Sequence, residues 1–227
     1  MAPPRLIPVA DSALLVAFGS VVDDALYRRV LALDRALAAA PPPGFAEAVP
    51  AFVNLLVRFD PLVTDHVAMA DAVRALLDRP AAPPGPVATH LVEVCYDPDL
   101  APDLAAVAAA TGLSPDGVVA AHLSGDYSVA LYGFAPGYAY LSGTPAPIRL
   151  PRKAAALRGI PAGSVLIAGA QCLVTTLTMP TGWSIIGRSP TQILRNDPVR
   201  PFLFAVGDRV QMRRISRARF DAARRAP

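Results

Sequence analysis

From residue 127 onward, short apolar stretches alternate with glycine and proline every 8 to 12 residues. This pattern constrains the fold most, because each apolar stretch is too short for a helix and is followed at once by residues that favour a turn. The predicted strands are residues 127–134, 163–168, 172–177, 184–187, 192–194 and 209–215. Such spacing favours a closed or nearly closed β-barrel.

The first 80 residues have a different pattern, which predicts strand, helix, strand and helix. Residues 13–18 form an apolar run that Gly19 ends, and residues 52–59 form a second one. Asp23 and Asp24 open a helix, which suits the positive end of the helix dipole. Its apolar residues recur at helical spacing, at Leu26, Val30, Leu33 and Leu37. Thr64 or Asp65 caps a second helix that runs through Leu77.

Residues 80–86 contain four prolines and a glycine, and this composition indicates an interdomain linker. We therefore expect two domains, residues 1–84 and 85–227. After the linker, residues 90–96 read as a strand and residues 103–111 as a helix ended by Gly112. A further helix begins at Ser114-Pro115 and runs to about His122.

The net charge of +3 resides in the C-terminal tail. Seven of the 21 basic residues lie within residues 209–227, and the rest of the chain is mildly acidic. An arginine-rich tail can contact phosphates, but a solvated and partly disordered end is the commoner case. We therefore expect no nucleic-acid partner.

Other classes of protein are disfavoured by what the chain contains. Two cysteines, Cys95 and Cys172, without a CxxC motif argue against a disulfide framework and structural zinc, and no metal site is expected. The N-terminus lacks the layout of a signal peptide, and no apolar run is long enough to span a bilayer. We expect a cytoplasmic protein without a membrane partner.

Three segments concentrate glycine, proline and aromatic residues: residues 132–143, residues 161–171 and residues 181–190, the last with the only tryptophan. Glycine, serine and Gln171 could bind a planar amide or a carboxylate. Arg152 and Arg188 could each hold a carboxylate or a phosphate in bidentate fashion. Barrel-corner glycines and surface arginines would give the same pattern, so both interpretations remain open.

Familiar catalytic signatures are missing. The sequence has no Gly-x-Ser-x-Gly and no Walker loop, and Lys153 is its only lysine, which leaves no Ser-Ser-Lys arrangement. His122 is the best polar candidate among three histidines, since it precedes the motif-rich region. A histidine that satisfies carbonyls at the end of a helix is the alternative.

The order of motifs resembles the allophanate hydrolase subunit 1 family. The matching motifs are Gly133-Phe-Ala-Pro-Gly-Tyr-Ala-Tyr-Leu141, Leu150-Pro-Arg152, Pro161-Ala-Gly-Ser-Val-Leu-Ile-Ala-Gly-Ala-Gln171 and Gly182-Trp-Ser-Ile-Ile-Gly-Arg-Ser-Pro190. The resemblance extends over about residues 5 to 215. The family includes the B subunit of 5-oxoprolinase and a sensor histidine kinase inhibitor.

The resemblance implies an α+β protein, with a ferredoxin-like α/β N-terminal domain followed by a cyclophilin-like β-barrel domain. It also implies a subunit of an ATP-dependent complex that hydrolyses a cyclic or linear amide. The partner would be a protein of the type of allophanate hydrolase subunit 2 or the C subunit of 5-oxoprolinase. We expect ATP to be used by the complex, no cofactor bound by this chain alone, and little turnover without the partner. The alternative is a regulatory protein that inhibits a sensor histidine kinase.

The same resemblance assigns a candidate site. The expected catalytic residues are His122, Tyr127, Arg152, Gln171 and Arg188. The expected pocket residues are Gly133, Phe134, Pro136, Gly137, Tyr140, Gly163, Ser164, Gly169 and Trp183. One departure stands out, because Thr175 occupies a position at which the family usually has tyrosine.

Overall fold

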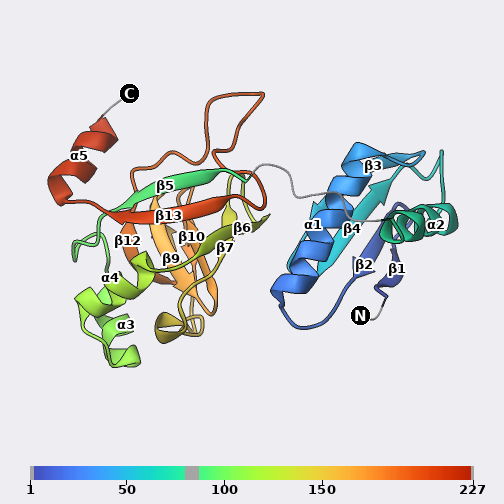
Figure 1. The fold of residues 1–227 in the computed structure, drawn as a ribbon. Helices are drawn as coiled ribbons and strands as arrows, with labels where there is room; N and C mark the ends of the chain where they lie inside the picture. Colours follow the sequence, from blue (N-terminus) through green and yellow to red (C-terminus); the bar gives the residue numbers. More distant parts are fainter. Residues whose placement is uncertain (1–2, 80–86, 226–227) are drawn as a thin grey trace. The chain divides into compact units, whose positions relative to one another are not determined.

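The computed structural model describes residues 3–79 and 87–225. The chain divides into two compact units, Met1–Pro86 and Val87–Pro227, here called unit 1 and unit 2. Figure 1 shows that each unit has its own sheet and its own helices. The predicted linker, residues 80–86, lies outside the described residues, and each unit is described by itself.

Unit 1 is a four-stranded sheet with two helices. The elements are β1 (Arg5–Val9), β2 (Ala13–Ala17), α1 (Asp24–Ala39), β3 (Phe45–Pro50), β4 (Asn54–Phe59) and α2 (His66–Leu77). The sheet is antiparallel, in the order β1-β2-β4-β3. Both helices cover the same face, because Val30 of α1 and Met69 of α2 share one core with Leu14 and Leu55 of the strands.

Side-chain caps explain where the helices begin. An oxygen of Asp23 accepts hydrogen bonds from the backbone N–H of Ala25 and Leu26, at 2.8 and 3.0 Å. Asp65, rather than Thr64, caps α2 by accepting from the N–H of Ala68 at 2.8 Å. The predicted starts of both helices are confirmed, because a capping carboxylate is a local signal that the sequence displays directly.

The connectivity of unit 1 differs from the expected one. A ferredoxin-like domain has the element order βαββαβ, whereas the described part of unit 1 has ββαββα. The reason is that the edge of the sheet beside β2 is filled by β1, which precedes β2 in a hairpin. Apolar periodicity misses β1 and β3, since both are edge strands, are largely exposed, and contain Pro8 and Pro50.

Unit 2 is built on a seven-stranded sheet. Its strands are β5 (Thr89–Val94), β6 (Tyr127–Tyr132), β7 (Ala139–Ser142), β9 (Ser164–Ala168), β10 (Gln171–Val174), β12 (Ser184–Arg188) and β13 (Arg209–Arg214). The order is β12-β9-β10-β7-β6-β13-β5, and only β13 and β5 are parallel. A bridge between Cys95, directly after β5, and Arg188 of β12 joins the two edges and closes the barrel. The predicted barrel is confirmed.

The interior of the barrel is apolar and is closed by two helices, α3 (Leu104–Thr111) and α4 (Pro115–Leu123). Val165 and Ile167 of β9 point inward, while Leu166 and Ala168 belong to a second cluster on the outer face. A two-stranded ribbon, β8 (Leu157–Ile160) and β11 (Met179–Thr181), packs on that outer cluster. Every residue of β9 is therefore buried, which explains its continuous apolar run.

One expectation for unit 2 is wrong, and the order of the tail, which the sequence left open, is decided by the structure. Residues 192–194 form no strand and make only one isolated bridge, between Leu194 and Phe202. The C-terminal tail is also ordered within the described residues, as helix α5 (Arg217–Arg225). Its Phe220 is buried against Cys95 and Leu100, which an arginine count cannot reveal.

No single helix among the described residues meets the length and hydropathy expected of a membrane span. The pair α3 and α4 meets them only when joined across a bend of 92°.

Candidate functional site

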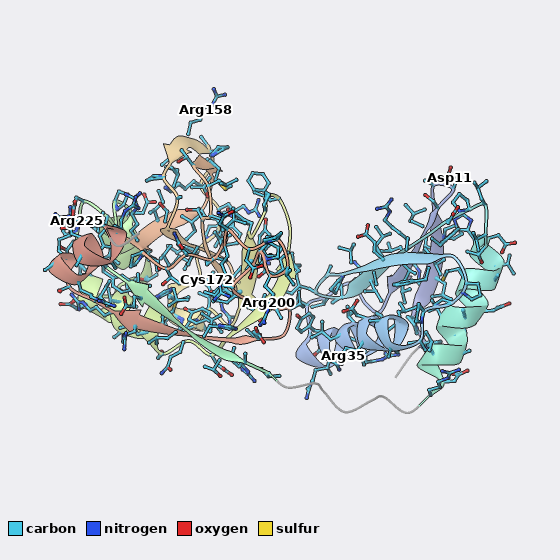
Figure 2. The ribbon with its side chains drawn as sticks, turned by 90° about the horizontal axis from the view of Figure 1, so that it is seen from above. Asp11, Arg35, Arg158, Cys172, Arg200 and Arg225 are labelled. Carbon is cyan, nitrogen blue, oxygen red and sulfur yellow. The ribbon has the colours of Figure 1, made fainter. Side chains whose placement is uncertain are left out.

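His122 and Tyr127 lie inside the barrel. The Nδ1 of His122 is 2.7 Å from the hydroxyl of Tyr96, and its Nε2 is 3.4 Å from the Sγ of Cys172. Tyr127 donates a hydrogen bond to the carbonyl oxygen of His122 at 3.0 Å. Figure 2 shows Cys172 surrounded by side chains of the barrel. The network links α4 to β6 and β10 and satisfies polar atoms that would otherwise be unpaired in the core.

Burial keeps all groups of this network neutral. It lowers the pKa of His122 to about 3, and it raises the pKa values of the Cys172 thiol and the Tyr96 and Tyr127 hydroxyls. A neutral imidazole can donate from one ring nitrogen and accept at the other, which matches its two neighbours. The structure thus places His122 and Tyr127 among interior packing residues, apart from the other predicted site residues.

A cluster of aromatic residues lies on the outer face of the barrel. The ring centroids of Phe134 and Tyr138 are 5.4 Å apart, those of Tyr138 and Tyr140 are 5.5 Å apart, and those of Tyr140 and Trp183 are 5.8 Å apart. The guanidinium carbon of Arg152 lies 5.5 Å from the Trp183 centroid. These five residues are called the aromatic face below.

The loop between β6 and β7 positions the first part of this face. Phe134 has a φ of +71°, and the N–H of Ala135 bonds to the carbonyl of Gly133 at 2.9 Å, forming a three-residue turn around Phe134. This left-handed conformation is rare for a bulky residue and costs free energy. Thr176 fixes the loop by donating to the carbonyl of Pro136 at 2.7 Å. The result is a Phe134 ring that is 71% exposed.

The backbone on either side of Arg152 is fixed to the barrel. Leu150 accepts a hydrogen bond from the N–H of Gly169, and the N–H of Lys153 donates to the carbonyl of Gly182, both at 2.7 Å. The ammonium of Lys153 lies 2.5 Å from Asp103, whose same oxygen accepts from the N–H of Ile185 at 2.7 Å. Sequence reasoning misses Asp103 and Lys153. The single lysine beside a predicted arginine was the available signal.

Gln171 lies on the same outer face. In the register of the sheet it pairs with Ala168 of β9 and Ser142 of β7. Trp183 directly precedes Ser184, which pairs with Ile167, so Trp183 lies beside Ala168. Gln171 and Trp183 are therefore about two strand spacings apart, roughly 10 Å.

Arg188 lies at the other end of the barrel strands. It pairs with Ser164, four residues along β9 from Ala168, which corresponds to about 13 Å. Its Nε donates to the carbonyl of Ala162 at 3.2 Å, and burial lowers the pKa of its guanidinium. Gly163 has a φ of +85°, and a Cβ there would lie 2.4 Å from the carbonyl oxygen of Ser189. These residues form the turn beside the closing bridge.

Thr175 belongs to the same turn. Its hydroxyl accepts from the N–H of Ser164 and donates to the carbonyl of Pro161, both at 2.9 Å. Thr175 is buried, so its hydroxyl holds the turn before β9 instead of lining an open wall.

The predicted site residues thus divide into three groups. The aromatic face brings together Arg152, Phe134, Tyr140 and Trp183, with Tyr138 as a member that the sequence did not single out. Gln171 and the hairpin turn at Gly169 adjoin it, and Gly133, Pro136 and Gly137 shape its loop. The other groups are the buried His122 network and the Arg188 turn. Of the three, only the aromatic face combines an exposed ring, that of Phe134, and a partly exposed one, that of Tyr140, with a cation, an arrangement suited to binding a small planar acid.

The chain is similar to known proteins over nearly its whole length. Residues 4–204 match the family model described as carboxyltransferase domain, subdomain C and D. A Bacillus subtilis protein, named as the B subunit of 5-oxoprolinase, is 36% identical over 225 residues, which are 94% of each chain.

Solved structures share the fold. The crystal structure of TTHA0988 is 35% identical with a TM-score of 0.78, covering 89% of this chain, and this chain spans only 39% of that one. The urea amidolyase of K. lactis has a TM-score of 0.76 at 14% identity over 96% of this chain and 15% of its own, a likeness that concerns the fold alone.

Proposed function

This chain belongs to the family of carboxyltransferase domains, subdomains C and D, and on that premise we propose that it is the B subunit of a 5-oxoprolinase-type hydrolase complex. The proposal is supported by the similarity to the Bacillus subtilis protein, which extends through both units. The complex opens the lactam of 5-oxoproline by adding water across its C–N bond, which yields glutamate.

The observation that carries the proposal is the aromatic face. Arg152 lies over Trp183, and its charge is close enough to Tyr138 and Tyr140 to oppose the rise in pKa of their hydroxyls. Such a surface suits a flat ring that bears a negative charge, and 5-oxoproline is one. We infer that this chain contributes substrate binding and orientation.

Other components supply the remaining chemistry. Breaking an unactivated lactam is coupled to ATP in this proposal, and the sequence has no Walker loop for binding the nucleotide. We therefore assign ATP binding to another component, and we propose a second barrel protein, of the type of the C subunit of 5-oxoprolinase, as the direct partner. A linear amide acid such as allophanate is the alternative substrate.

The test is reconstitution. The purified chain is mixed with its partner subunits, and ATP-dependent release of glutamate from 5-oxoproline is measured with and without this chain. We expect release only in the complete mixture. Assembly of the complex without release of glutamate would contradict the proposal. Release of product from allophanate in the same mixture would make allophanate, instead of 5-oxoproline, the proposed substrate.

A further inference from the structure

We propose that Arg152, which lies over the buried Trp183, is the receptor for the carboxylate of a small lactam acid, with the ring of the ligand held against the partly exposed Tyr140. The identity of the lactam rests on the proposed function. The carboxylate site itself rests on the geometry below.

The charge of Arg152 is available to a ligand. Several other arginines of unit 2 are paired with carboxylates, for example Arg213 with Glu93 at 2.6 Å and Arg217 with Asp99 at 2.5 Å. Arg152 has no carboxylate or hydrogen-bond partner within residues 3–79 and 87–225. A guanidinium that lies over an aromatic ring keeps its N–H groups free at the edge, and these can hold a carboxylate by two parallel hydrogen bonds.

The backbone beside Arg152 is fixed before a ligand binds. The neighbouring Lys153 is attached by its backbone to Gly182 and by its side chain to Asp103. The charge of Lys153 is therefore already neutralised, and Arg152 supplies the positive charge of the aromatic face. A fixed backbone lowers the conformational entropy that binding would otherwise cost.

The two tyrosines supply neutral donors beside this charge. Neither the Tyr138 nor the Tyr140 hydroxyl has a hydrogen-bond partner in the described part of the chain. Burial raises the pKa of Tyr138 to about 12 and raises that of Tyr140, while the nearby charge of Arg152 opposes both shifts. Both hydroxyls remain protonated at neutral pH and can donate to the amide oxygen of a lactam. Gln171 lies opposite Ala168 in the sheet, as Trp183 does on the other side, and its side-chain amide can form a further hydrogen bond with the ligand.

By the same criteria, Arg188 is less suited than Arg152 to bind the carboxylate of a ligand. Its Nε is already bonded to the carbonyl of Ala162, and its backbone takes part in closing the barrel. It also lies close enough to Arg224 for the two positive charges to interact.

The chain offers its own reporter for the test, because Trp183 is the only tryptophan. The full chain is titrated with 5-oxoproline, with 2-pyrrolidinone, which lacks the carboxylate, and with cyclopentanecarboxylate, which lacks the amide. We expect a saturable change in fluorescence with 5-oxoproline and at least tenfold weaker binding of 2-pyrrolidinone. Arg152→Gln should weaken 5-oxoproline binding at least tenfold.

Arg158→Gln is the matched control. Arg158 is an exposed arginine on β8, and Figure 2 shows its side chain projecting at the edge of the molecule. The change removes the same charge from the same unit, so its binding curve should equal that of the unchanged protein. Far-UV circular dichroism establishes that both variants are folded.

The outcomes separate this inference from the proposed function. The assignment of Arg152 as the carboxylate receptor is overturned if Arg152→Gln binds 5-oxoproline as tightly as the unchanged protein. It is also overturned if neither 5-oxoproline nor cyclopentanecarboxylate gives a saturable change in fluorescence. A third outcome is that cyclopentanecarboxylate binds in an Arg152-dependent manner and 5-oxoproline does not. This outcome supports the carboxylate site but excludes a lactam as its ligand, and it therefore excludes 5-oxoproline as the proposed substrate. Full glutamate release by a complex that contains Arg152→Gln leaves the proposed function standing and overturns the receptor.

Discussion

Cys95 and Arg188 exchange two backbone hydrogen bonds, at 2.8 and 2.9 Å, and these bonds join the two edges of the seven-stranded sheet. The closure is a single bridge between two residues that are 93 positions apart in sequence. Phe220 of α5 packs on Cys95, so the C-terminal helix covers the place where the barrel closes.

Phe220→Ala should therefore destabilise the barrel. The ring is 3% exposed, and its removal leaves a cavity beside Cys95 and Leu100. We expect a loss of about 3 kcal/mol in the free energy of unfolding, measured by denaturant titration, and faster amide exchange at Cys95 and Arg188. Arg225→Ala, on the exposed part of the same helix, is the control and should change little. Unchanged exchange in Phe220→Ala would mean that α5 does not protect the closure.

His122 should make stability depend on pH. Its pKa is about 3 in the folded protein and about 6.5 in the unfolded chain, so only the unfolded state binds the proton between these values. Stability is therefore full above pH 6.5 and is lost as the pH falls, by up to about 1.4 kcal/mol per pH unit. Between pH 7 and pH 5 we expect the native protein to lose about 2 kcal/mol more than His122→Asn.

The comparison with His122→Asn isolates this residue, since every other ionisable group is the same in both proteins. Denaturation curves at the two pH values provide the measurement. Parallel losses in the two proteins would show that His122 is not buried in its neutral form.

Thr175→Val should weaken the turn before β9. The hydroxyl is replaced by a methyl group, which leaves the buried N–H of Ser164 and the carbonyl of Pro161 without this partner. Because the N–H and the hydroxyl of Ser164 still donate to the Pro161 carbonyl, at 3.3 and 2.8 Å, we expect a loss of about 1 kcal/mol in unfolding free energy. Thr175→Ser keeps the hydroxyl and should lose clearly less. Equal losses in both variants would assign the effect to packing of the methyl group.

Phe134→Gly should separate stability from activity. Glycine adopts the φ of +71° without strain, so the free energy of unfolding should stay unchanged or rise by about 1 kcal/mol. The exposed ring contributes to the aromatic face, and its loss should lower glutamate release by the assembled complex severalfold. Full activity with raised stability would remove Phe134 from the functional surface.

The sequence by itself determined the features that rest on neighbouring residues. Asp23 and Asp65 mark helix starts because a cap acts over three residues, and Gly112 ends α3 because it adopts a φ of +71°. The barrel could be predicted from the regular alternation of short apolar stretches and turn residues. Edge strands such as β1 lack that pattern, because neither face is fully buried.

Only the tertiary structure decided which of the predicted residues belong together. Alternation along a strand gives the face on which a side chain lies, but the register between strands decides at which end it lies. This is why Gln171 and Arg188, both candidates for one pocket, are at opposite ends of β9. The same cause put His122 into the interior and joined Arg152 to Trp183, since each contact spans at least 30 residues of chain and depends on how the barrel closes.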